Sequence, residues 1–378
     1  MPQALVNGRL LIGRKLVTAQ AVIVDEGRIE SIVGQDELPS DCDIVDLGAH
    51  ILAPGFIDVQ VNGGGDRLFN DDPSVEVIAA IGRAHRRFGT TGFLPTLISD
   101  DAAKIAAALD AARLAIASDV PGVLGVHIEG PFLNPAKKGI HDPAKLRPIT
   151  NSDVKLLSRP IRGKTVVTLA PEAVPADAIR RLASAGAIVC AGHTQATADQ
   201  VFEALRNGLR GFTHLFNAMS QLGAREPGVV GAALYDENSW CGIIVDGHHV
   251  DSRVLKIALR AAPHRRFMLV SDAMPSVGGS KSFILNGERI SASAGKCVNS
   301  QGTLAGSDLD MASAVRNAVA LLGLDVADAL MMASANPATF LGLDHELGRI
   351  QAGYRANLVL LDNGLNVTDT WIDGVRAG

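Results

Sequence analysis

The amino-acid sequence predicts an α/β fold, a (β/α)8 TIM-like barrel with a small β-sandwich domain that is built from both termini. Three observations lead to this prediction. The two ends of the chain carry short β-branched runs separated by turn residues, whereas the centre alternates short apolar runs with helical stretches. The length of 378 residues suits one large domain and one small domain.

The N-terminal segment is predicted to form a series of short antiparallel strands. Apolar runs at 4–6 and 21–24 are each followed by a turn signal, Asn-Gly or Glu-Gly. The C-terminus has the same character, with the apolar run 356–361 before another Asn-Gly pair. Because neither end alone has enough strands to bury a face, we expect residues 1–53 and 346–378 to form one small β-domain.

Residues 54–345 show the alternating pattern of βα units, which is typical of a parallel sheet and which we assign to one large domain. The predicted strands are 55–61, 92–97, 123–129, 165–170, 187–191, 211–214, 242–246 and 267–272. Helical spacing of apolar residues predicts helices over 75–88, 101–117, 176–185, 197–207 and 252–262. Eight such strands match a (β/α)8 barrel, in which the sixth strand is the shortest of the set. Residues 281–306 break the rhythm and predict a β-hairpin insertion after the eighth strand.

Composition and charge exclude several classes of protein. Hydrophobic residues make up 47% of the chain and charged residues 20%, which excludes a disordered chain. The net charge is −5, and no basic run could follow a nucleic-acid backbone. The sequence has neither an apolar stretch of ~18 residues nor the pattern of a signal peptide. We therefore expect a cytoplasmic protein that binds a small molecule, without nucleic-acid or membrane partners.

Polar side chains follow the predicted strands at the edge where barrel active sites lie. These side chains are Gln60, Asn62, Thr96, Glu129, Glu172, His193, His214, His249 and Asp272. Glu129, His193 and His214 offer one carboxylate and two imidazoles, which are ligands of catalytic zinc that leave a fourth position for water. Each alone could be a helix cap or a hydrogen-bonded core residue. Together at strand ends they predict a shared metal ion.

Asp272 ends a very apolar run, 267–270, where an unpaired carboxylate would be costly to bury. A nearby metal ion and its water would stabilise the charge. The alternative is an aspartate that caps the loop before Pro275. Two further histidines are given no catalytic or ligand role. We expect His85 to be exposed to solvent on its helix. We expect His127, which shares a face with Glu129 one layer deeper, to support the site without binding the metal ion.

Six short strings at the predicted strand ends form a series of motifs. They are Pro54-Gly55-Phe56-Ile57-Asp58, His127-Ile128-Glu129-Gly130-Pro131-Phe132, Gly192-His193-Thr194, Thr213-His214-Leu215-Phe216-Asn217-Ala218-Met219, Asp246-Gly247-His248-His249-Val250 and Ser271-Asp272-Ala273-Met274. The series resembles the N-acetylglucosamine-6-phosphate deacetylases of the amidohydrolase superfamily. The resemblance covers essentially the whole chain, and the second and fourth strings are specific to this branch.

The resemblance implies roles for the matching residues. Glu129, His193 and His214 would be the metal ligands, Asp272 the catalytic acid and base, and His141 the residue that polarises the acetyl carbonyl. The implied substrate-binding residues are Gln60, Ile140, His141, Asn217, Ala218, Arg225 and His249, with Leu304, Ala305 and Gly306 lining the acetyl pocket. From the residues alone, His141 would be a surface loop histidine.

The resemblance also implies an assembly, because in that family the arginine matching Arg225 reaches the phosphate in a neighbouring subunit. We therefore expect a homodimer with shared sites. A surface arginine paired with Glu226 is the alternative. The sequence departs from the superfamily at Gln60 and Asn62, where many members have a His-x-His pair. Amide oxygens are weak zinc ligands, so we expect one divalent metal ion per chain, zinc in the first place.

The strand-end residues predict a metal-dependent hydrolase, and the resemblance implies that it deacetylates N-acetylglucosamine 6-phosphate to glucosamine 6-phosphate and acetate. Water activated by the metal would be the nucleophile, with an aspartate as general acid and base. One alternative is a related amidohydrolase that acts on another N-acyl amino sugar or a cyclic amide. Another is an inactive barrel that serves as a sugar-phosphate sensor or scaffold, against which the retention of all three ligands and Asp272 counts.

Overall fold

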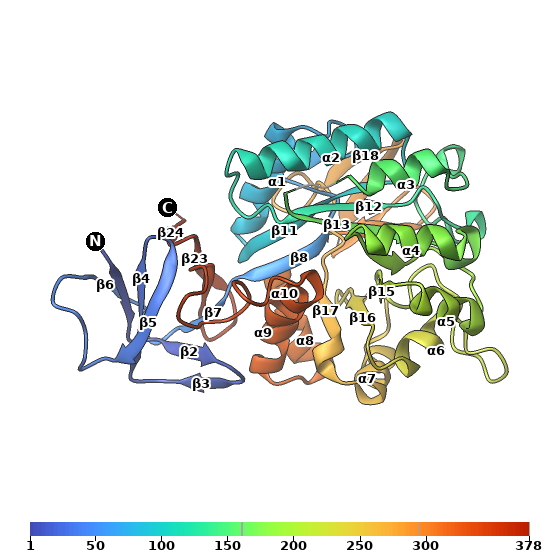
Figure 1. Ribbon diagram of the computed structural model, residues 1–378. Helices are drawn as coiled ribbons and strands as arrows, with labels where there is room; N and C mark the ends of the chain where they lie inside the picture. The colour runs from blue at the N-terminus through green and yellow to red at the C-terminus, as the bar shows by residue number, and fades with distance from the viewer. Residues whose placement is uncertain (160–161, 294, 378) are drawn as a thin grey trace.

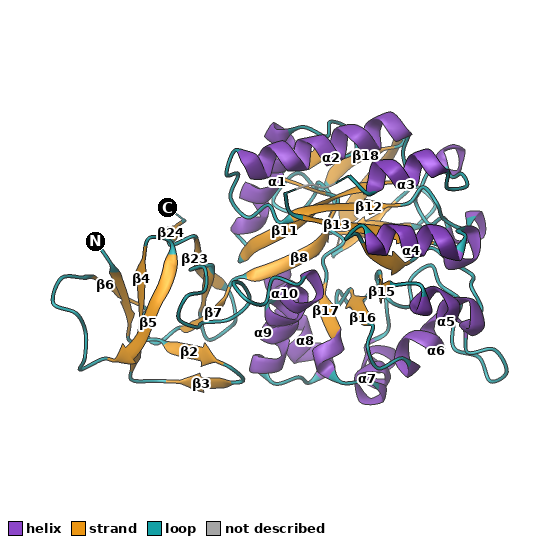
Figure 2. Cartoon of the chain, viewed as in Figure 1, coloured by secondary structure: helices purple, strands orange, loops and turns teal. Residues whose placement is uncertain are grey.

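The computed structural model describes residues 1–159, 162–293 and 295–377, and it places a parallel barrel beside a smaller β-domain (Figure 1). Both termini lie in the β-domain, and helices surround the strands of the barrel (Figures 1 and 2). Within the described residues, no helix combines the length and the apolar character needed to span a membrane.

The barrel strands follow one another around the barrel in sequence order. They are β8 (Phe56–Val61), β11 (Thr90–Ile98), β12 (Gly125–Glu129), β13 (Lys164–Leu169), β14 (Ile188–Ala191), β15 (Leu209–Phe212), β16 (Trp240–Ile243) and β17 (Phe267–Leu269). Each is parallel to its neighbours. The ring closes just beyond β17, where the Asp272 N–H donates to the Gln60 carbonyl at 3.0 Å and Val61 bridges Ala273. The predicted fold class is confirmed.

Three of the predicted strands differ from the structure near their C-terminal ends. The predicted ranges 211–214, 242–246 and 267–272 run two or three residues past β15, β16 and β17. The backbone leaves the extended region at these points, since φ is +34° at His214 and +52° at Asp272. These two side chains therefore stand on the loops at the barrel mouth rather than in the strands.

The five helices that were predicted begin and end within two residues of their predicted bounds. The α-helices are α1 (Val75–Arg86), α2 (Ala102–Ala117), α3 (Asn151–Leu157), α4 (Ala176–Ser184), α5 (Ala198–Arg206), α6 (Gly228–Tyr235), α7 (Ser252–Ala261), α8 (Met311–Leu322), α9 (Val326–Ala333) and α10 (Ala335–Leu341). The 3-10 turns are η1 (Pro135–Lys137), η2 (Pro143–Lys145), η3 (Pro171–Ala173) and η4 (His264–Arg266). Capping boxes at Thr150 and Thr197 start α3 and α5.

Two sheets form the β-domain. One contains β1 (Gln3–Val6), β4 (Gln20–Asp25), β5 (Arg28–Gly34) and β6 (Asp43–Asp46). The other contains β2 (Arg9–Ile12), β3 (Lys15–Val17), β7 (Ile51–Pro54), β22 (Leu358–Leu361), β23 (Val367–Ile372) and β24 (Val375–Arg376). Strand β22 pairs with β7, so both ends of the chain share this sheet. Leu5, Leu10 and Trp371 pack between the sheets. The domain boundaries at 53 and 345 stay predictions.

The insertion after β17 is larger than the predicted hairpin. It is a four-stranded antiparallel sheet of β18 (Ser282–Leu285), β19 (Glu288–Ser293), β20 (Lys296–Val298) and β21 (Leu304–Ser307). Its buried face, with Leu285 and Ile290, packs with Met274 and Ile98 of the barrel mouth and with the partly buried Ile140. The insertion therefore forms one wall of the mouth.

The expectation for His85 is wrong, because its side chain is fully buried. Its Nε2 lies 2.9 Å from the Gly63 carbonyl, in a ribbon of β9 (Gly63–Gly64) and β10 (Arg67–Leu68) that follows β8. A carbonyl only accepts, so Nε2 carries the hydrogen. Gly64 makes room for the ring, since a Cβ there would lie 2.8 Å from it. Helix α1 thus anchors the turn behind Asn62.

A buried carboxyl links the first and last barrel strands. Asp58 is fully buried in β8, and its Oδ1 accepts from the N–H groups of Gln60 at 3.2 Å and Ser271 at 3.3 Å. Among the described residues, its Oδ2 has no hydrogen-bond partner. Burial raises the pKa of Asp58 from 3.8 to about 7. The folded protein therefore keeps a proton that the unfolded chain releases above pH ~4.

The stabilising effect of this proton is complete below the unfolded pKa of Asp58 and is lost as the pH rises towards 7. Asp58→Asn keeps an oxygen for the two N–H groups but cannot ionise. Between pH 5.5 and 7, we expect the wild type to lose on the order of 2 kcal/mol more unfolding free energy than the variant. Urea unfolding of both proteins in chelator measures this, and parallel pH dependences would contradict it.

Candidate active site at the barrel mouth

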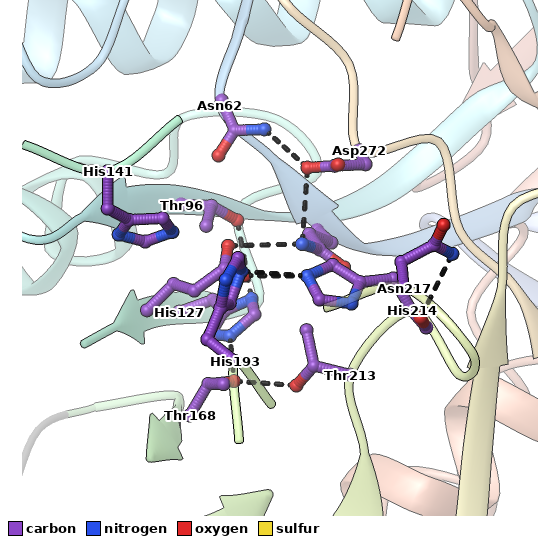
Figure 3. A network of polar contacts seen from close by, with 12 residues as sticks. Asn62, Thr96, His127, His141, Thr168, His193, Thr213, His214, Asn217 and Asp272 are labelled. Atoms are coloured by element: carbon purple, nitrogen blue, oxygen red, sulfur yellow. Dashed lines mark hydrogen bonds and ion pairs between the residues drawn. The ribbon is translucent and has the colours of Figure 1, made fainter. Parts of the chain in front are cut away.

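Three side chains from different strand ends converge at the mouth of the barrel. Glu129 ends β12, while His193 and His214 each lie two residues past β14 and β15. Oε1 of Glu129 lies 3.1 Å from Nε2 of His193 and 3.0 Å from Nε2 of His214. The two Nε2 atoms are 3.1 Å apart, and all three side chains are buried. Figure 3 shows the two rings directed at one another.

The backbone at both histidines is unusual. φ is +48° at His193 and +34° at His214, a region that residues other than glycine rarely adopt. Such conformations cost of order 1–3 kcal/mol each and persist where the surrounding structure imposes them. Gly192 permits the close approach of the strands here, because a Cβ on it would lie 2.6 Å from Thr168. The fold therefore maintains strain to aim these two rings inward.

The hydrogen bonds of His193 show that the cluster fits a cation. Its Nδ1 lies 2.8 Å from the Lys137 carbonyl, so Nδ1–H donates and the neutral ring presents a lone pair at Nε2. That lone pair faces the Glu129 carboxylate, which also only accepts. Burial alone would raise the pKa of Glu129, but without a metal ion, hydrogen bonds and positive charge from His193 and His214 in their protonated forms hold it well below its usual range. In the described chain this is the one group of three such ligand atoms within 4.8 Å, and it could hold a metal ion.

Two amide side chains stand beside the cluster. Gln60 Nε2 donates to Glu129 Oε2 and to Asp272 Oδ1, both at 3.1 Å. Asn62 Nδ2 donates to Asp272 Oδ1 at 2.7 Å, as Figure 3 shows. Because carboxylates only accept, both amides direct N–H groups rather than oxygens at these carboxylates. The amides therefore hold Glu129 and Asp272 in place.

Asp272 is partly buried on the loop after β17. Burial raises the pKa of its carboxyl, and the negative charge of Glu129 raises it further. A raised pKa makes a carboxylate a better proton acceptor near neutrality. The carboxylate is thus oriented by two amide donors and suited to proton transfer.

His141 also lies in this site, on the loop between η1 and η2. The Ser99 N–H donates to His141 Nδ1 at 3.2 Å, so in the neutral ring Nε2 carries the hydrogen. Burial, assisted by the nearby His193, lowers the pKa of His141 well below its usual value. The ring centroids of His141 and His193 are 4.4 Å apart. His141 is therefore a neutral hydrogen-bond donor beside the triad.

A cavity of about 180 Å³ opens above these groups. The sequence-predicted residues that line it are Glu129, Ile140, His141, His193, His214, Asn217, Ala218, His249, Asp272, Leu304 and Gly306. Three predicted residues do not line it. Gln60 donates to Glu129 from beneath the cavity, and Ala305 is buried in the insertion. Arg225 is exposed outside the cavity.

Sequence reasoning missed several lining residues. They are Asn62, which was placed at the strand end but given no substrate role, and Ile98, Gly139, Ile244 and Met274. Ile98 ends β11 and Met274 follows Asp272, so their position after barrel strands was a usable signal. From the residues alone, only polar side chains at those points were considered as candidates.

Two predicted residues are held by neighbours. His249 Nδ1–H donates to Asp246 Oδ2 at 2.6 Å, which fixes the ring beside the cavity. His127 lies deeper and bonds Thr168 at 2.7 Å and the Val59 carbonyl at 3.1 Å, not Glu129. Burial lowers the pKa of His127 to about 4, so it is neutral. It supports the barrel strands beneath the site.

Comparisons with known proteins agree with this geometry. The model described as "Amidohydrolase family" matches residues 51–377, and that described as "NagA composite domain" matches residues 3–52. An N-acetylgalactosamine-6-phosphate deacetylase of Shewanella sp. (strain ANA-3) is 45% identical, over 87% of this chain and 83% of the relative.

Two solved structures are similar over almost their whole length. The N-acetylglucosamine-6-phosphate deacetylase of Pasteurella multocida has a TM-score of 0.97 at 34% identity, over 100% of both chains. The N-acetyl-D-glucosamine-6-phosphate deacetylase of Mycobacterium smegmatis has a TM-score of 0.90 at 30% identity, over 99% of both chains. The latter structure is of an aspartate-to-alanine mutant in complex with N-acetyl-D-glucosamine-6-phosphate.

Proposed function

Because this chain belongs to the amidohydrolase family, among the N-acetylglucosamine- and N-acetylgalactosamine-6-phosphate deacetylases, we propose that it hydrolyses the acetamide of N-acetylglucosamine 6-phosphate. The products are glucosamine 6-phosphate and acetate. One observation carries the proposal: Glu129, His193 and His214 converge in the same cavity as Asp272 and His141. This arrangement offers three ligands for a metal ion, a carboxylate that can carry a proton, and a hydrogen-bond donor for the carbonyl oxygen of the substrate.

One divalent ion per chain, zinc, fits the triad of a carboxylate and two imidazoles. Such an ion lowers the pKa of a water molecule and supplies a nucleophile at neutral pH. Gln60 and Asn62 stand where a second ion would need ligands, but their N–H groups donate to Glu129 and Asp272. This use of the amides supports a single ion.

The side chains of the chain perform the proton transfers. The Asp272 carboxylate, held by Gln60 and Asn62, accepts the proton of the attacking water as oxygen bonds to the acetyl carbon. His141 Nε2–H donates to the carbonyl oxygen as negative charge develops there. Asp272 then returns the proton to the nitrogen as the C–N bond breaks, so the sugar leaves as a free amine.

We assign the sugar to the side of the cavity formed by Asn217, Ala218 and His249 and the acetyl methyl to the side formed by Leu304 and Gly306. A second candidate substrate is N-acetylgalactosamine 6-phosphate, because the relative with 45% identity is a deacetylase of that sugar. The two sugars differ only in the configuration at C4.

Steady-state kinetics on zinc-loaded enzyme test the proposal with three sugars: the two N-acetylhexosamine 6-phosphates and unphosphorylated N-acetylglucosamine. We expect the highest kcat/KM for N-acetylglucosamine 6-phosphate and a far lower value without phosphate, because remote binding energy can be used at the reacting centre. A higher value for the galactose epimer would favour the second candidate. Equal values with and without phosphate, or no acetate release, would contradict the proposal.

Asp272→Asn should keep the metal and the fold but lower kcat by at least about 10²-fold, since its amide can neither take nor return a proton. Metal analysis and kinetics on the same preparation measure both. Asp251→Asn is a matched control, because Asp251 is an exposed N-cap of α7 and asparagine caps equally well. Near-normal turnover of Asp272→Asn, or loss of its metal, would contradict the role.

We further propose a homodimer in which Arg225 binds the phosphate in the neighbouring site. Arg225 is exposed on the loop before α6 and does not line the cavity of its own chain. The alternative pairing with Glu226 is disfavoured, because Oε1 of Glu226 accepts the N–H groups of Ala198 at 2.8 Å and Gly228 at 2.9 Å. An arginine fork suits a phosphate dianion, and a two-fold contact would exchange one arginine per subunit.

Subunit mixing tests the shared site. Arg225→Ala and Asp272→Asn homodimers should each be nearly inactive, whereas a mixed dimer has one doubly defective site and one intact site. After co-refolding of equal amounts, roughly a quarter of all sites should regain activity. Each variant refolded with itself is the control. Activity that stays at the level of the controls would contradict a site shared across a two-fold interface.

A further inference from the structure

Glu172 stands at the carboxyl end of β13, in η3, and does not line the cavity. Its carboxylate accepts three hydrogen bonds. Thr194 Oγ1 donates to Oε2 at 2.5 Å, and the Gln195 N–H donates to Oε1 at 2.6 Å. Asn134 Nδ2 also donates to Oε1, at 2.9 Å. Glu172 therefore joins the segment after β14 to the segment after β12.

The first of these segments begins at His193. Thr194 and Gln195 directly follow the residue whose φ of +48° aims the ring at Glu129. A strained backbone of this kind persists only where neighbouring contacts impose it. The two hydrogen bonds to Glu172 hold the backbone immediately after the positive φ at His193. Thr194, which makes one of them, is fully buried. The carboxylate thus maintains the conformation that presents His193.

The second segment runs from Asn134 to His141. The Asn134 N–H donates to the His193 carbonyl at 2.9 Å, and its Oδ1 accepts the Ala136 N–H at 2.9 Å as the cap of η1. Lys137 at the end of η1 accepts the bond from His193 Nδ1–H. Four residues later lies His141, whose ring contacts that of His193. Asn134 therefore fixes the turn that orients His193 and leads to His141.

These contacts form a closed circuit. Glu172 binds the two residues after His193, and the His193 ring binds Lys137. Asn134, three residues before Lys137, binds Glu172 and completes the circuit. We propose that Glu172 is a positioning residue that holds His193 and the segment 134–141 in one arrangement. It acts on the metal through the orientation of His193, and on the substrate carbonyl through the place of His141. The inference rests on the proposed function in taking His193 as a metal ligand.

The test compares Glu172→Ala, Glu172→Gln and the wild type by two measurements. One is the affinity for Zn²⁺ in competition with a chromogenic chelator, and the other is hydrogen exchange of the metal-free protein. Loss of a group that orients a ligand typically costs 10- to 100-fold in metal affinity, and we expect Glu172→Ala to fall in that range. It should also lose exchange protection in segments 134–141 and 193–196.

Two variants separate positioning from general destabilisation. Glu172→Gln keeps an oxygen for Asn134 and Gln195, so it should stay close to the wild type in both measurements. Asp362→Ala is the matched control, because Asp362 also accepts several bonds, from Gly364 and Asn366, but lies in the β-domain. It should change neither measurement at the site. If Glu172→Ala does not fold, Asn134→Ala breaks the same circuit from the other side and should give the same two losses.

Unchanged zinc affinity or unchanged protection in the Glu172→Ala protein, or in Asn134→Ala where that variant replaces it, would overturn the inference. So would a Glu172→Gln protein as impaired as Glu172→Ala, or an Asp362→Ala protein with the same zinc loss. A His193→Ala protein that binds zinc as tightly as the wild type would instead contradict the proposed function. Exchange of the metal-free protein then still decides whether Glu172 holds the two segments.

Discussion

The site at the barrel mouth depends on one electrostatic constraint: a carboxylate oxygen and two imidazole nitrogens face one another within 3.1 Å in a buried place. Because the Lys137 carbonyl fixes the hydrogen of His193 on Nδ1, this ring and Glu129 both present lone pairs. Two such groups repel each other unless a proton or a cation lies between them, and the three ligand atoms could hold a metal ion here. The positive φ at both histidines directs their rings toward this point, and in our proposal the hydrogen bonds of Glu172 maintain that direction for His193.

The same constraint explains why the first and last strands meet as they do. Gln60 donates to both Glu129 and Asp272, so one amide couples the proposed metal ligands to the proposed proton carrier. Asp58, two residues earlier on β8, binds the Ser271 N–H next to Asp272 and closes the ring. Barrel closure and the placement of the Asp272 carboxylate are therefore one structural feature. A buried carboxyl with a raised pKa is the cost of that closure.

The sequence predicted the barrel and the triad because apolar runs and the polar residues after them follow a regular pattern. It placed the ends of β15 and β17 too late, because positive φ at His214 and Asp272 leaves no mark on hydrophobic periodicity. His141 has no periodic signal, since it lies on a loop, and only the family resemblance indicated it. His85 was misread because its burial depends on the absence of a side chain at Gly64. Glu172 was seen at its strand end, but its three partners come from other segments.

Metal content per chain tests the central claim most directly. Purified protein without added metal, analysed beside His193→Ala and His214→Ala, should contain about one divalent ion per chain in the wild type and almost none in the variants. Far-UV circular dichroism confirms that the variants are folded. Two ions per chain in the wild type, or an ion retained when either histidine is removed, would contradict a single ion held by Glu129, His193 and His214.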